Sequence, residues 1–187
     1  MLSNEGYGLL PIKDADIDIL DSFDCGKPHL NGFLTTTARE MHEGLLSSTS
    51  LVFHQDFDGL VGYFTLSHDG IPLSTGEEYE LGYNGQPNLS SFPAVKIGRL
   101  AISKDIQKQG VGTAVMGMIR GDVIGAKSLS AARILVVDAE NDPDVIRFYE
   151  RYGFERSQWA DKQAKNHGGR ASARPFTIKM IRDVLKP

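Results

Sequence analysis

The sequence is poor in the features on which several protein classes depend. Its 187 residues include one cysteine, Cys25, which excludes an internal disulfide and a cysteine-rich metal site. No apolar run approaches the roughly 18 to 20 residues that a membrane-spanning helix needs. The first residues lack the basic patch and apolar core of a secretory signal. We therefore expect a cytoplasmic protein without a metal, in which Cys25 is a small buried hydrophobic residue and not a nucleophile.

Neither sign of charge is in large excess, and the formal net charge of -4 argues against a protein that coats nucleic acid. The net charge differs between the two parts of the chain. Residues 144–187 hold ten Lys or Arg and five Asp or Glu, a net of +5, which leaves -9 for residues 1–143. Lys162, Lys165, Arg170 and Arg174 lie in this basic part, around a glycine pair. A phosphate-binding surface and a solvated loop both remain open for them.

The hydrophobic pattern predicts a single α/β domain, residues 1–187, with a mixed central sheet flanked by helices. The Asp58-Gly59 pair indicates a hairpin between two of the strands. Residues 67–92 show weak periodicity and predict a long connection, either a lid beside the substrate or a surface excursion. We expect strands at 7–12, 50–54, 60–66, 94–103, 133–138, 154–158 and 176–181, and helices at 14–23, 28–43, 110–128 and 143–151.

A strand at 94–103 delivers a glycine loop to the start of a helix. Gly110 and Gly112 let a ligand approach the backbone, and the first helical turn leaves amide N–H groups free for phosphate oxygens. The segment is not a P-loop, because no lysine stands beside Gly112 and Thr113. It is not a dinucleotide fingerprint either, because Val115 occupies the position of its third small residue. The loop therefore favours another anionic cofactor.

Gln107-x-x-Gly110-x-Gly112 resembles the Gln/Arg-x-x-Gly-x-Gly/Ala signature of the GNAT acetyltransferases. A second segment, Phe148-Tyr149-x-x-x-Gly153-Phe154, resembles the Phe/Leu-Tyr-x-x-x-Gly-Phe ending of the same family. The resemblance implies a GNAT-like fold that binds acetyl-CoA through a core at about 94–158. It implies the following cofactor-binding residues: Leu100, Ala101, Ile102, Gln107, Lys108, Gln109, Gly110, Val111, Gly112, Thr113, Asp142 and Phe148.

Transfer of an acetyl group to an amine requires a donor to the oxyanion, a proton for the leaving thiolate and a base for the amine. The resemblance gives the first role to a backbone amide within 100–102 and the second to the Tyr149 hydroxyl. Four residues are candidates for the base: Glu140, Asp138, His68 and Asp69. For Arg99 a salt bridge is favoured slightly over a functional contact.

The stretch from Phe23 to Leu34, with Cys25, Leu30 and Phe33, is similar to the Phe-x-Cys-x-x-x-x-Leu-x-x-Phe-Leu opening of one GNAT subgroup. This subgroup contains the toxins of type II toxin-antitoxin modules. The similarity implies acetylation of the α-amine of an aminoacyl-tRNA, a homodimer and an antitoxin partner. A GNAT enzyme that acetylates a small or protein amine, and a non-catalytic acyl-CoA-binding module, remain alternatives.

Overall fold

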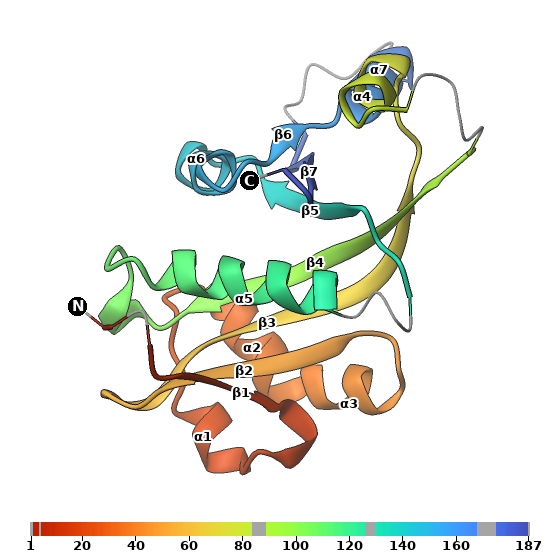
Figure 1. Ribbon diagram of the computed structural model, residues 1–187. Helices are drawn as coiled ribbons and strands as arrows, with labels where there is room; N and C mark the ends of the chain where they lie inside the picture. Colours follow the sequence, from red (N-terminus) through yellow and green to blue (C-terminus); the bar gives the residue numbers. More distant parts are fainter. Residues whose placement is uncertain (1, 4, 84–88, 126–129, 168–174, 187) are drawn as a thin grey trace. The chain divides into compact units, whose positions relative to one another are not determined.

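The computed structural model describes residues 2–3, 5–83, 89–125, 130–167 and 175–186 (Figure 1). Its chain forms two compact units, Met1–Ser67 with Ile97–Gly121, and His68–Lys96 with Asp122–Pro187. The described strands are hydrogen-bonded in the order β1-β2-β3-β4-β5-β7-β6. Strands β3 (Phe57–Ile71) and β4 (Phe92–Ile102) and helix α5 (Val111–Gly125) contribute residues to both units. None of the described helices is long and apolar enough to cross a membrane.

The first unit is an antiparallel sheet covered by short helices. Strand β2 pairs with β1 on one side and with β3 on the other. Gly62 of β3 lies against Ala101 of β4, and Thr65 lies against Gly98, so β4 runs antiparallel to β3. The unit also contains β1 (Tyr7–Pro11), η1 (Ile12–Asp14), α1 (Ile17–Asp21), α2 (Pro28–Thr36), α3 (Ala38–Glu43), β2 (Ser48–His54) and η2 (Lys104–Ile106).

The second unit contains the parallel pair that makes the sheet mixed. Arg133 N donates to Pro93 O, and Lys96 reaches Asp138, so β4 and β5 advance in the same direction. Strand β7 pairs antiparallel with both β5 and β6. The elements are α4 (Thr75–Glu80), β5 (Ile134–Glu140), α6 (Pro143–Arg151), β6 (Glu155–Arg156), α7 (Gln158–His167) and β7 (Thr177–Asp183).

The predicted α/β fold with a mixed sheet is confirmed, and two helices of the first unit differ from expectation. The helix expected at 14–23 is replaced by η1 and the short α1. The helix expected at 28–43 begins at Pro28 as predicted but is divided into α2 and α3 at Thr37. The hydroxyls of Thr35 and Thr36 donate to Gly32 O, and such back-bonding bends a helix.

The predicted hairpin exists, but its turn is not at Asp58-Gly59. His54 pairs with Phe57, so Gln55 and Asp56 make the turn and Gly59 lies within β3 with a φ of +94°. The buried imidazole of His54 accepts a hydrogen bond from Asp56 N at 3.0 Å, which ties the turn to its strand. A side chain two residues before Asp56 thus stabilises the turn, which the Asp-Gly pair did not locate.

Two corrections concern the second unit. Residues 67–92 are not a structureless connection, because β3 extends to Ile71 and α4 follows it; residues 84–88 lie outside the described residues. The strand expected at 154–158 is only the two-residue β6, and α7 follows it without having been predicted. Lys162 and Lys165 are therefore exposed helical residues, whereas Arg170 and Arg174 lie outside the described residues.

Candidate functional site

The glycine loop of the first unit joins η2 to α5 with an unusual backbone. Lys108 has a φ of +62° and Gly110 a φ of +88°. The left-handed conformation is costly for a lysine, and such strain persists where the surrounding structure determines it. Thr113 N donates to Gly110 O at 2.9 Å and closes the turn that enters α5. Left-handed residues before a helix N-terminus direct N–H groups toward one concavity, which fits the pyrophosphate of an acyl-CoA.

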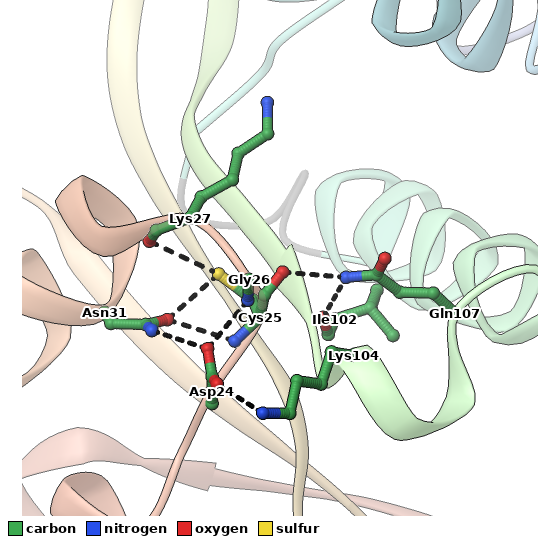
Figure 2. Close-up of polar contacts among 8 residues, drawn as sticks. All are labelled: Asp24, Cys25, Gly26, Lys27, Asn31, Ile102, Lys104 and Gln107. Atoms are coloured by element: carbon green, nitrogen blue, oxygen red, sulfur yellow. Dashed lines mark hydrogen bonds and ion pairs between the residues drawn. The ribbon is translucent and has the colours of Figure 1, made fainter.

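The same unit brings this loop to the end of β4. Gln107 Nε2 donates to Ile102 O and to Cys25 O, each at 2.9 Å (Figure 2). Ala101 is buried, and its carbonyl occupies the space where Gly62 has no side chain. The predicted cofactor residues at 100–102 and 107–113 thus belong to one local structure.

Helix α6 of the second unit carries the predicted general acid. Asp142 Oδ1 accepts from Asp144 N at 2.8 Å and Val145 N at 3.3 Å, so its carboxylate caps the helix. The helix ends before Gly153, whose φ is +73°. The amphipathic pattern of α6 directs Ile146 and Tyr149 inward.

Tyr149 is 7% exposed and lies between two other aromatic rings. Its ring centre is 5.1 Å from that of Phe148 and 5.3 Å from that of Phe154. Burial raises the pKa of Tyr149 well above its ordinary value, and the charge of Glu140 adds to the shift. The hydroxyl therefore remains protonated at neutral pH, as a proton donor to a thiolate must.

The four candidate bases have different surroundings. Asp138 accepts from Lys96 Nζ at 2.5 Å and lies 2.7 Å from Lys179 Nζ. Burial alone would raise the pKa of Asp138, but the two ammonium groups outweigh it and hold the pKa below its ordinary value. Asp138 is therefore a poor base. Asp69 lies in the last part of β3, half-buried, and accepts from Gly70 N at 2.8 Å.

His68 is exposed, whereas Glu140 is half-buried and acts electrostatically on Tyr149. For Arg99, the described residues show two contacts, neither of them an ion pair. Its guanidinium lies 4.8 Å from the centre of the Phe33 ring, and Nη1 donates to Gly98 O.

A profile of the GNAT acetyltransferase domain matches residues 47–156, which is more than half of the chain. The chain belongs to the GNAT acetyltransferase family. It is therefore an acetyl-CoA-dependent N-acetyltransferase, as the two sequence motifs implied. The GNAT profile spans β2 to β6 and so includes the glycine loop and α6.

Solved structures of GNAT toxins share the fold over nearly the full length. A tyrosine-to-phenylalanine mutant of KacT is 24% identical, with 96% of both chains covered and a TM-score of 0.71. AtaT complexed with acetyl-methionyl-tRNAfMet is 23% identical, with 92% of this chain and 93% of that chain covered and a TM-score of 0.69. A mutant AtaT toxin bound to the C-terminus of the antitoxin AtaR and acetyl-CoA is 21% identical, covers 96% and 94%, and has a TM-score of 0.68.

Sequence reasoning assigned no role to three polar residues that contact this part of the GNAT domain. Asp24, Asn31 and Lys104 form a hydrogen-bonded group beside Gln107 (Figure 2). The Asp24-x-Gly26 pattern, typical of a side-chain-stabilised turn, was a local signal for one of them. The contact with Lys104 joins residues 80 positions apart, which no local pattern reveals.

Proposed function

We propose that this GNAT enzyme acetylates the α-amine of an aminoacyl-tRNA and thereby stops translation. The observation that carries the proposal is the similarity to AtaT complexed with acetyl-methionyl-tRNAfMet, which covers 92% of this chain. That similarity extends beyond residues 47–156, the part that the general GNAT profile matches. The segment before residue 47 holds the Phe23-x-Cys25 opening, which resembles the toxin subgroup.

The charge distribution supports a nucleic-acid substrate, because one segment of the chain carries an excess of positive charge. Residues 144–187 carry a net charge of +5, although the whole chain carries -4. Lys162 and Lys165 are exposed on α7, where ammonium groups are available to phosphates. We place phosphate contacts in this basic segment, and an antitoxin that masks it is the partner we expect. A homodimer also remains part of the proposal.

In the proposed reaction the acetyl thioester supplies the acyl group, and the protein supplies binding and proton transfer. The amides around Gly110 and Gly112 hold the pyrophosphate, and an amide within 100–102 stabilises the oxyanion. Tyr149 donates its proton to the departing thiolate. Glu140 is the candidate base that we retain, because Asp138 is neutralised by two lysines.

The test is a cell-free translation reaction with and without acetyl-CoA. We expect inhibition that needs the cofactor, together with N-acetylated aminoacyl-tRNA detected by mass spectrometry. Tyr149→Phe should lower kcat by about a hundredfold or more while keeping affinity for CoA. Tyr79→Phe, on a residue 72% exposed, is the matched control and should behave as wild type.

Three outcomes discriminate the alternatives. If translation is unchanged but the enzyme acetylates small or protein amines, its substrate is an amine of that class and not an aminoacyl-tRNA. Acetyl-CoA binding without acetylation of any amine would favour a non-catalytic binding module. Tyr149→Phe with a kcat equal to that of wild type would contradict the role of Tyr149 as the proton donor.

A further inference from the structure

The first residue of the cofactor-loop signature turns its side chain toward the protein's own backbone. Both N–H groups of the Gln107 amide are used, one by Ile102 O and one by Cys25 O (Figure 2). Ile102 ends β4, whereas Cys25 precedes α2 and lies 82 residues away in the sequence. Gln107 therefore connects the loop to the Phe23-x-Cys25 segment.

That segment is held in shape by its own hydrogen bonds. Asp24 Oδ1 accepts from Gly26 N and from Asn31 Nδ2, both at 2.8 Å. Asn31 Oδ1 accepts from Cys25 N at 3.0 Å and lies 3.0 Å from the Cys25 thiol. A single side chain of α2 thus fixes both Asp24 and Cys25, including the carbonyl that Gln107 contacts.

A second connection runs from Asp24 to Lys104, at the start of η2. Lys104 Nζ lies 2.7 Å from Asp24 Oδ2, and Lys104 N donates to Asp24 O at 2.9 Å. The Lys104 ammonium and two further donors, Gly26 N and Asn31 Nδ2, lower the pKa of Asp24 far below its ordinary value. Lys104 is the first residue of η2 and Gln107 directly follows it, so both ends of this short turn are anchored to the segment around Asp24 and Cys25.

We propose that Asp24 and Asn31 are positioning residues for the acetyl-CoA loop. This inference rests on the proposed binding of the pyrophosphate by residues 107–113. Lys108 holds a left-handed conformation one residue after Gln107, and a strained backbone needs neighbours that determine it. The Asp24–Asn31 group provides them from outside the loop. This positioning role explains why the Phe23-x-Cys25 segment matters to the enzyme, although none of its residues takes part in acetyl transfer.

The test measures CoA binding by calorimetry and steady-state kinetics of acetyl transfer for Asn31→Ala and Asp24→Asn. We expect Kd for CoA and KM for acetyl-CoA to rise about three- to tenfold, the effect of losing one or two hydrogen bonds. We expect kcat to change less than twofold. Hydrogen exchange should increase at residues 104–112, and the conservative Lys104→Arg should bind CoA more tightly than Lys104→Met. Two exposed residues supply matched controls, Asn166→Ala and Asp58→Asn.

Asp24→Asn separates positioning from simple electrostatics. Removing a negative charge near an anionic ligand should tighten binding if Lys104 acts only by its charge. Weaker binding supports positioning, and unchanged or tighter binding overturns it. A lower melting temperature with an unchanged Kd also overturns it, because the group is then structural only. If wild type binds no CoA, the proposed function fails first. If wild type binds and both variants bind equally well, this inference alone fails.

Discussion

A single buried carboxylate in the second unit joins two helices, and its removal gives a sharp test of the fold. Glu77 is 5% exposed and accepts from Ser74 N at 2.7 Å, from Gln158 N at 2.7 Å and from Trp159 N at 3.3 Å. The first bond completes the capping box of α4, and the other two cap the N-terminus of α7. One side chain therefore serves the N-termini of two helices whose sequences are about 80 residues apart.

The cost of Glu77→Ala follows from these three bonds. Loss of a helix cap costs about 0.5–2 kcal/mol, and a buried N–H without a partner costs about 1–3 kcal/mol. Gln158 is exposed and Trp159 half-buried, so water reaches part of the vacated site. We therefore expect a loss of about 2–4 kcal/mol in the free energy of unfolding. Glu77→Gln keeps one acceptor oxygen and should lose roughly half as much.

Trp159 makes the assay specific, because it is the only tryptophan in the sequence. Urea unfolding followed by its fluorescence reports on the start of α7, and circular dichroism reports on the whole chain. The midpoint should fall by about 1–2 M in urea for Glu77→Ala. Glu80→Ala, at an exposed position of the same helix, controls for helix propensity. A Glu77→Ala variant within 0.5 kcal/mol of the control, with unchanged emission, would refute the double-cap argument.

Three further predictions follow from contacts elsewhere. Burial alone would raise the pKa of Asp183, but Arg133 together with Leu185 N and Lys186 holds it below its ordinary value, so Asp183→Asn should cost about 1.5–3 kcal/mol at pH 7. This difference should shrink as pH falls below about 4, because the unfolded chain then binds the proton first; an equal difference at pH 7 and pH 2 would contradict it. Burial raises the pKa of the Cys25 thiol, so a disulfide reagent at pH 8 should react at least about tenfold more slowly with folded than with urea-unfolded protein. Gly62→Ala should lower the free energy of unfolding by about 1–3 kcal/mol and raise KM for acetyl-CoA, because the added methyl group would overlap the Ala101 carbonyl. The control is Gly117→Ala, at a glycine with open space around it. Equal melting temperatures for the two variants would refute the predicted overlap.

Local patterns predicted those parts of the fold that local chemistry controls. Pro28 and Pro143 begin helices, because proline tolerates the first helical position, and Gly153 ends one in the left-handed conformation. The glycine loop was found in the same way, since Gly110 needs a backbone that few residues adopt. Helix α7 was missed, although Ser157 accepts from Ala160 N and gave a usable start signal.

The roles of charged side chains required the tertiary structure. From the sequence alone, Asp138 is a candidate base, because it is an acidic residue at the end of a predicted strand. Its two lysine partners come from β4 and β7, and they lower its pKa. Tyr149 needed no such correction, because its motif already specifies an inward-facing aromatic residue on α6, and burial follows from helical periodicity.

The sequence by itself determined the α/β class, the GNAT family, the glycine loop and the helix that carries Tyr149. Each of these depends on residues within a few positions of one another, whose spacing sets backbone conformation and side-chain direction. Only the tertiary structure decided that Glu77 caps two helices, that Asp138 is neutralised, and that Gln107 faces Cys25. These contacts join segments 40 or more residues apart, and their energies depend on burial and partner geometry, which spacing along the chain does not encode.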